Sequence, residues 1–186
     1  MIGIWISVIL FILMIMVAQI LTPPEYNWKK NTVSELAAQN YKNRKIMQAG
    51  FISFGTLLSS SCIIGFVFEE VPLYKGIPIL IYALSVGISG IFCTQPFVKG
   101  EQYAENESRI HSLCAQLAGF SFMIAITVCI IASEDIRLKI LHTIAGVFVM
   151  GCSLLFAKLP EHRGVVQRVM YLGSFLWLSF MYTIRF

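Results

Sequence analysis

Six long apolar runs alternate with short polar segments along this chain. They lie at about residues 2–21, 46–68, 77–93, 110–132, 136–157 and 165–184. Since an α-helix rises ~1.5 Å per residue, about 20 apolar residues are needed to cross the ~30 Å hydrocarbon core of a bilayer. The pattern therefore predicts an all-α fold, in which residues 1–186 form a single integral membrane domain built as a polytopic transmembrane six-helix bundle.

The first apolar run could be mistaken for a secretory signal peptide. However, the run from Ile2 to Leu21 has no basic residues ahead of it and is longer than the apolar part of a signal peptide. It is followed by Thr22-Pro23-Pro24, which is no small-residue cleavage site and which stops a helix. We therefore interpret this run as the first transmembrane helix.

The polar segment after the first run contains a helix signal of its own. Between Asn31 and Ala38, Thr32 can cap a helix N-terminus while Glu35 reaches back to it from three residues later. Tyr26 and Trp28 precede this stretch, and aromatic residues are enriched at membrane interfaces. The segment therefore predicts a short amphipathic helix in the first loop, lying on the membrane surface.

The composition agrees with a membrane protein. Of the 186 residues, 57% are hydrophobic and only 13% are charged, and the mean hydropathy is +0.75. A soluble domain carries roughly 25% charged residues, so this chain has too few to cover a soluble surface. The net charge of +4 suits a protein that borders anionic lipid. We expect no nucleic-acid partner, because no basic cluster is interleaved with exposed polar sequence.

The five cysteines do not predict a disulfide scaffold or a zinc site. They are widely spaced in apolar segments, without a CxxC motif: Cys62, Cys93, Cys114, Cys129 and Cys152. Cys93 and Cys114 would lie near the same membrane face. A bridge between them is the one pairing left open.

The basic residues divide unevenly between the two ends of the predicted bundle. Six spans place both chain termini at one end and the first, third and fifth loops at the other. Ten basic residues belong to those odd loops and their flanks: Lys29, Lys30, Lys42, Arg44, Lys45, Lys99, Arg109, Lys158, Arg163 and Arg168. Four belong to the opposite end: Lys75, Arg137, Lys139 and Arg185. The positive-inside rule then predicts that the odd loops lie in the cytoplasm and the termini outside the cell membrane.

Polar side chains that can form a binding site gather at the odd-loop end. Five of them are candidate ligand-binding residues: Glu35, Arg109, His111, Gln167 and Arg168. The two arginines would attract an anion, and His111 and Gln167 would be its hydrogen-bond partners. Because a lone arginine inside a bundle is costly, we predict that Arg168 pairs with Glu35. The alternatives are that Arg168 extends to the lipid headgroups and that Glu35 only caps the short helix.

The histidines do not predict a haem or metal centre. His142 lies ~9 Å below the even-loop end of its span and His111 within ~3 Å of the odd-loop end of its own. Across ~30 Å of hydrocarbon they differ in depth by ~18 Å, too far for two ligands of one iron or zinc ion. We therefore expect no metal and no cofactor. For His142 we expect a hydrogen bond between helices, with a proton relay as the alternative.

Three short stretches carry a family likeness. They are Asn31-Thr32-Val33-Ser34-Glu35-Leu36-Ala37, then Cys93-Thr94-Gln95-Pro96 with His111 and Ala115, and Gly164-Val165-Val166-Gln167-Arg168 leading into Leu172-Gly173 and Leu176-Trp177-Leu178. Together they resemble the first-loop, third-loop and last-span patterns of the domain-of-unknown-function 998 (DUF998) membrane family.

The resemblance implies six helices but no settled activity. This chain has Glu35 and Gln95 where the family usually has aspartates. The loss of an acid at Gln95 weakens a metal-binding interpretation. Relatives that carry their basic residues on the short even loops would place the odd loops outside. The charge count and the resemblance therefore leave both orientations open.

Three functions remain compatible with these patterns. The leading hypothesis is a non-catalytic pocket for an anionic lipid headgroup or small amphiphile, serving sensing or transport. The second is a membrane-embedded metal-dependent hydrolase that uses Glu35, His111 and Glu101, although HExxH, GxSxG and phosphate-loop motifs are absent. The third is the substrate-binding subunit of a larger transporter with an unknown partner subunit, since six spans in 186 residues leave little room for an alternating pathway.

Overall fold

The computed structural model describes residues 2–68, 71–98 and 100–181, and within these ranges the regular structure is entirely helical. The long helices are α1 (Ile2–Ile20), α2 (Arg44–Phe68), α3 (Leu73–Ile91), α4 (Glu105–Ala132), α5 (Ile136–Lys158) and α6 (Arg163–Leu176). Three short elements are the 3-10 helices η1 (Ser34–Ala37) and η2 (Pro160–His162) and the π-helical turn η3 (Trp177–Met181).

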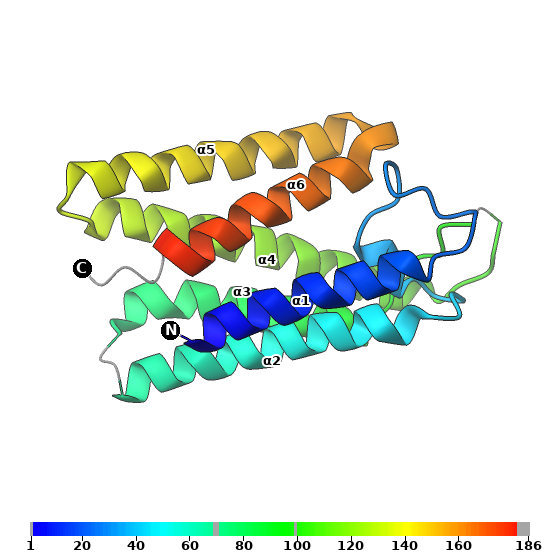
Figure 1. The fold of residues 1–186 in the computed structure, drawn as a ribbon, viewed down its shortest axis with the longest axis horizontal. Coiled ribbons are helices and arrows are strands. Elements are labelled where there is room, and N and C mark those ends of the chain that lie inside the picture. The colour runs from blue at the N-terminus through cyan, green and yellow to red at the C-terminus, as the bar shows by residue number, and fades with distance from the viewer. Residues whose placement is uncertain (1, 69–70, 99, 182–186) are drawn as a thin grey trace.

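The helices run back and forth along the long axis of the molecule, and each packs against the next in the sequence (Figure 1). The first loop (residues 21–43), the α3–α4 loop (92–104) and the α5–α6 connection (159–162) lie together, at what we call the loop end. The α2–α3 and α4–α5 connections and the start of α1 lie at the opposite end, the turn end. The predicted division of the loops between two ends is therefore present.

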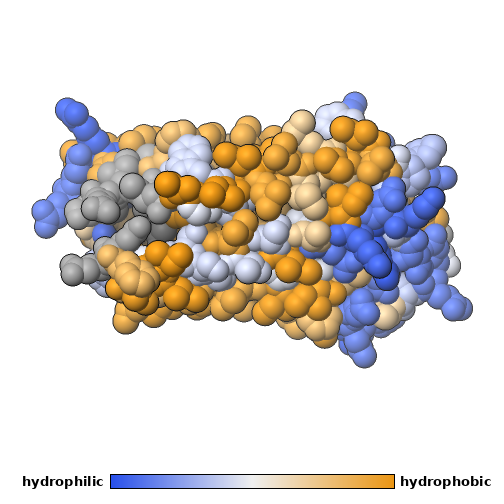
Figure 2. All heavy atoms as spheres, turned by 60° about the horizontal axis from the view of Figure 1, so that its bottom comes forward, coloured by the Kyte–Doolittle hydropathy of each residue, from blue (hydrophilic) through white to orange (hydrophobic). Residues whose placement is uncertain are grey.

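Five of the helices, α1 to α5, are long and apolar enough to cross a membrane. A broad hydrophobic middle separates hydrophilic residues at the two ends, with the larger hydrophilic area at the loop end in this view (Figure 2). The structure agrees with the sixth predicted span only in part. Its α-helix ends at Leu176 and continues as the π-helical turn η3, and residues 182–184 fall outside the described residues.

The helices extend beyond the predicted apolar runs where polar residues can continue them. Helix α4 begins at Glu105, five residues before the predicted span, because Glu105 and Glu107 favour the positive N-terminal end of the helix dipole. Helix α3 begins at Leu73, before the predicted start at residue 77. Apolar length therefore locates the part of a helix that is suited to cross a membrane, whereas the helix itself extends further.

Aromatic side chains fill the centre of the bundle where α1, α2 and α6 meet. The ring of Phe11, which is 1% exposed, lies 5.3 Å from Phe51, 5.0 Å from Phe54 and 5.7 Å from Phe175, between ring centroids. Such rings bury large apolar areas and pack edge to face. This cluster packs α6 against α1 and α2.

The first loop does not form the surface helix that the sequence predicts. Its only helical turn is the four-residue η1, and Val33, Leu36, Ala37 and Ala38 are at most 1% exposed. Because Leu36, Ala37 and Ala38 are consecutive, they cannot share one face of a surface helix and need cover on several sides. The loop instead folds inward as a plug, with η1 against the ends of α1 and α2.

Candidate functional site

Arg168 is the centre of the hydrogen bonding between the first loop and α6. Its Nη1 donates to the backbone carbonyls of Trp28 at 3.0 Å, Asn31 at 3.1 Å and Gly164 at 2.9 Å. Its Nη2 donates to Gln19 Oε1 at 2.6 Å and to the Tyr26 hydroxyl at 2.8 Å. One guanidinium group therefore joins α1, the first loop and α6.

The acceptors of Arg168 are all uncharged. Tyr26 is buried, and burial raises the pKa of its hydroxyl to about 12 against the opposing effect of Arg168, so the phenol stays protonated. Its hydroxyl donates to the carbonyl of Thr32 at 2.8 Å while it accepts from Arg168. The positive charge of Arg168 is thus held in place by dipoles and is not neutralised.

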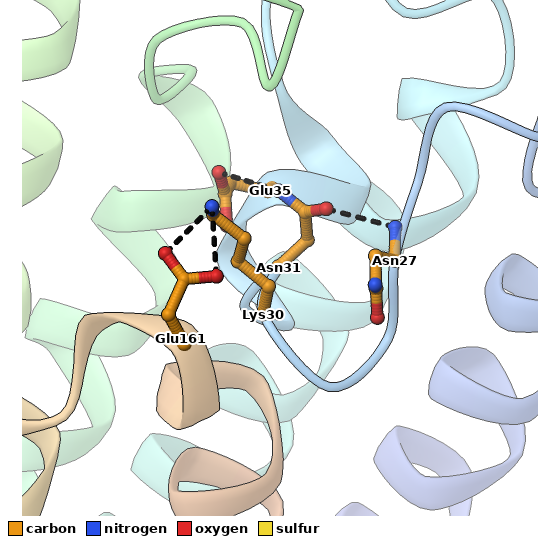
Figure 3. Close-up of polar contacts among 5 residues, drawn as sticks. All are labelled: Asn27, Lys30, Asn31, Glu35 and Glu161. Carbon is orange, nitrogen blue, oxygen red and sulfur yellow. Dashed lines mark hydrogen bonds and ion pairs between the residues drawn. The ribbon is translucent and has the colours of Figure 1, made fainter.

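The predicted ion pair between Arg168 and Glu35 is wrong. Glu35 instead accepts from the backbone N–H of Thr32 at 2.5 Å. It also accepts from Asn31 Nδ2 at 3.1 Å (Figure 3). The backbone N–H of Glu35 donates in return to Thr32 Oγ1 at 3.3 Å. This is the reciprocal capping pattern, so the alternative role of Glu35 as a cap describes its contacts correctly.

Gln167 also holds the first loop. Its Oε1 accepts from the buried backbone N–H of Val33 at 2.6 Å. One turn earlier, Gly164 lies so close to the carbonyls of Trp28 and Asn31 that an added Cβ would overlap both oxygens. Near the surface, Lys30 bonds both carboxylate oxygens of Glu161, at 2.8 and 3.0 Å (Figure 3). The start of α6 is therefore shaped to receive the loop.

His111 lies at a second hydrogen-bonded contact, between α3 and α4. We refer to this contact and to the one between the first loop and α6 as joints. It is 3% exposed, and its Nδ1 lies 2.8 Å from the carbonyl oxygen of Ser89 and 2.9 Å from that of Phe92. Carbonyl oxygens only accept, so Nδ1 carries the proton. Ser89 lies in the last turn of α3 and Phe92 directly follows the helix, where carbonyl groups lack N–H partners within the helix. His111 thus ties α4 to the end of α3.

Arg109 lies apart from both joints, on the exposed outer side of α4. Its Nη2 is 3.3 Å from Glu105 Oε2, and both side chains are largely exposed, at 75% and 69%. A surface groove of about 550 Å³ runs beside it. The groove is lined by Gln95, Tyr103, Glu105, Ser108, Arg109, Ser112, Leu113 and Gln116. Of the five predicted site residues, only Arg109 borders this groove.

The five predicted residues therefore occupy three places. Glu35, Gln167 and Arg168 share the joint between the first loop and α6, His111 lies at the α3–α4 joint, and Arg109 faces outward. Their joint role in ligand binding stays a prediction.

Three polar residues outside the five predicted site residues complete these joints. Gln19 and Tyr26 accept from Arg168, and Gln39 donates to the carbonyls of Cys93 at 3.2 Å and Ala104 at 3.0 Å. For Gln19 a signal exists in the sequence, because it is the one amide in an otherwise apolar first span. For Gln39 we find none, since a glutamine in a polar loop is ordinary.

No metal-ligand set forms among the described residues: no three His, Cys, Asp or Glu side chains gather closely enough to hold an ion. All five cysteines are free thiols, so the bridge between Cys93 and Cys114 is not formed. In the turn-end half of the bundle, His142 Nδ1 accepts from Trp177 Nε1 at 3.0 Å. The expected hydrogen bond of His142 between helices is therefore present.

Comparison with known proteins gives one match. A protein-family model described as "Protein of unknown function (DUF998)" matches residues 6–183. Neither the curated proteins nor the solved structures contain a significant match.

Proposed function

Since the chain belongs to the DUF998 family, whose description assigns no activity, we propose from its geometry that it is a non-catalytic membrane protein whose loop end recognises anionic lipid headgroups. The cell membrane is its proposed location, with the loop end on the cytoplasmic side.

One observation supports this function: the whole net charge of the protein belongs to the loop end. By sequence, that end carries ten basic residues and six acidic ones, namely Glu25, Glu35, Glu101, Glu105, Glu107 and Glu161. By sequence, the predicted even loops, the termini and their flanks carry four basic residues and four acidic ones, Glu69, Glu70, Glu134 and Asp135. The net charge is therefore +4 at the loop end and 0 at the opposite end. A basic residue near an anionic membrane surface contributes about 1 kcal/mol to attraction, and the contribution is screened by salt.

The fixed geometry of the first loop favours this function. Arg168 and Gln167 hold the first loop against α6, so the basic residues of this loop have fixed positions next to the hydrophobic middle of the molecule. An ordered surface loses less conformational entropy on binding than a mobile one. Arg168 acts here as a positioning residue, since five of its hydrogen bonds are already made within the protein.

The metal-dependent hydrolase has less support. It would need Glu35, Glu101 and His111 to converge, but each has separate partners: Glu35 bonds Thr32, Glu101 bonds Asn40, and His111 bonds the end of α3. A catalytic metal site needs at least three ligands around one point with an open position.

The proposed function can be tested by thermal unfolding in nanodiscs. A ligand that binds only the folded state stabilises it, so we expect a higher Tm in discs containing phosphatidylglycerol than in discs of phosphatidylcholine, with the difference shrinking at high salt. Exposed Lys42 and Lys45 make no side-chain hydrogen bond or ion pair with the described residues. Changing both to Gln should reduce the difference.

The matched control removes two basic residues from the turn end, Arg137→Gln with Lys139→Gln, and should leave the lipid-dependent difference unchanged. If both double variants reduce it equally, or if phosphatidylglycerol gives no difference, the proposed function is wrong.

The orientation has its own test. In a background lacking the native cysteines, Lys42→Cys should resist impermeant thiol reagents in intact cells, whereas Lys139→Cys should be labelled. The reverse pattern would show that the loop end faces outward, as the family resemblance implies.

A further inference from the structure

The groove on the outer side of α4 lies where a membrane lipid would lie. It extends from Gln95 and Tyr103 in the α3–α4 loop to Leu113 and Gln116 within the helix. From Arg109 to Gln116 there are seven residues, or ~10.5 Å along the helix axis. The headgroup region is ~5–8 Å thick on each side of the hydrocarbon core. The groove therefore begins among the headgroups and ends at the top of the hydrocarbon.

Gln116 gives the inner end of this groove an unusual polarity. It is exposed, and so are its neighbours Leu113, Leu117 and Phe120, which are 64%, 51% and 71% exposed and would face lipid in a membrane. The amide of Gln116 makes no hydrogen bond with any described residue. An amide that faces hydrocarbon without a partner is costly, so a polar group supplied by the surroundings would stabilise it. The ester carbonyls of a phospholipid lie at this depth and accept hydrogen bonds.

Arg109 gives the outer end a cation that can be shared. Its pair with Glu105 is a single 3.3 Å contact between exposed side chains, and such pairs contribute little to stability. A phosphate can accept two parallel N–H bonds from a guanidinium, which is a stronger arrangement than this contact. The other acid of the first turn, Glu107, is turned toward the backbone N–H of Cys93, at 3.4 Å.

We propose that this groove is a binding site for one anionic phospholipid, with Arg109 binding the phosphate and Gln116 binding an ester carbonyl. The proposal rests on the proposed function and names the site of one specific lipid within the wider electrostatic attraction. Between the two ends, Ser108 and Ser112 line the groove beside the glycerol region. The exposed apolar side chains below it would accompany the acyl chains.

The test is the affinity of the tightest phosphatidylglycerol adduct, measured by native mass spectrometry of the full chain released from detergent. Arg109→Gln should weaken this adduct about tenfold, which is equivalent to 1.4 kcal/mol. Gln116→Leu should weaken it about threefold. Glu105→Gln should strengthen it several-fold, because the carboxylate that competes with the phosphate for Arg109 is removed. A misfolded variant cannot produce this gain. The control Arg137→Gln should have no effect.

The outcomes separate the groove from the wider function. If phosphatidylglycerol still raises the Tm in nanodiscs but the tight adduct ignores Arg109→Gln and Glu105→Gln, the groove is not the site and the proposed function stands. If the lipid produces neither effect, both proposals fail. If inorganic phosphate competes for the adduct at the same concentration as the lipid does, the site binds a free ion and the lipid assignment is wrong.

Discussion

Arg168 and Arg109 lie at the same end of the molecule, yet their surroundings differ in almost every respect. Arg168 is half-buried and donates to five uncharged oxygens from α1, the first loop and α6. Arg109 is exposed and makes one long contact with a neighbour on its own helix. The comparison shows that an arginine stabilises the fold when its N–H groups already donate to acceptors within the protein. It remains available to a ligand when they do not.

Gly164→Ala should be the most damaging change. The added Cβ would overlap the backbone oxygens of Trp28 and Asn31, which cannot move without releasing the loop from α6. We expect a loss of about 3 kcal/mol in the free energy of unfolding, measured by denaturant titration in detergent. The control is Gly119→Ala on the outer side of α4, where nothing lies within 4 Å of the added atom. It should be neutral or stabilise by up to ~1 kcal/mol, and an equal loss in both variants would contradict the close-packed joint.

Arg168→Leu should cost about 2 kcal/mol, because the carbonyls of the first loop lose a charged donor. The informative measurement is a pair of double-mutant cycles. Arg168→Leu with Tyr26→Phe should be non-additive, since the two side chains share a 2.8 Å hydrogen bond. Arg168→Leu with Glu35→Gln should be additive within about 0.5 kcal/mol, because no ion pair joins them. Strong coupling in the second cycle would restore the ion pair that the sequence predicted.

Gln167→Leu should cost about 1.5 kcal/mol, since it leaves the buried N–H of Val33 without its acceptor. Gln116→Leu is the matched change on the outer side of α4 and should leave the free energy of unfolding unchanged or raise it. Both can be measured by the same titration. If the Gln116 variant is the less stable of the two, the amide has a structural partner and the groove interpretation fails.

Arg109→Gln should change the free energy of unfolding by less than about 0.5 kcal/mol, as is usual for an exposed side chain. Its effect should be confined to lipid affinity. A large loss of stability in this variant would place Arg109 in the same class as Arg168 and end the contrast between them.

The membrane architecture followed from the sequence because one physical requirement dominates it. An apolar run long enough to cross hydrocarbon has few alternatives to a helix, since its backbone groups must be satisfied internally. The ranges 46–68 and 136–157 therefore lie within two residues of the helices Arg44–Phe68 and Ile136–Lys158. The family assignment followed as well, because short motifs spread over the chain agreed with its span pattern.

The geometry of the joints did not follow from the sequence in the same way. The charge of Arg168 called for a partner, and Glu35 was the nearest acid in the first loop. The sequence does not identify the carbonyls of Trp28 and Asn31 as partners, because every residue has a backbone carbonyl. Only the folded path of the loop directs these two at the side chain of Arg168. The capping interaction of Glu35 was recognisable because it depends on a local spacing of three residues.

The contacts of the first loop also set the order in which the chain can fold during its synthesis on the ribosome. Its hydrogen bonds to α6 join residues 134 to 142 positions apart. At roughly 5–20 residues per second, translation needs on the order of 7–30 s between making the loop and making its last partner. During that interval Val33 and Leu36 can rest against α1 and α2 but not against α6. Until α6 has been synthesised, the nascent chain therefore has five helices and a first loop that packs only against α1 and α2. A chaperone or protease would act on this partly folded chain.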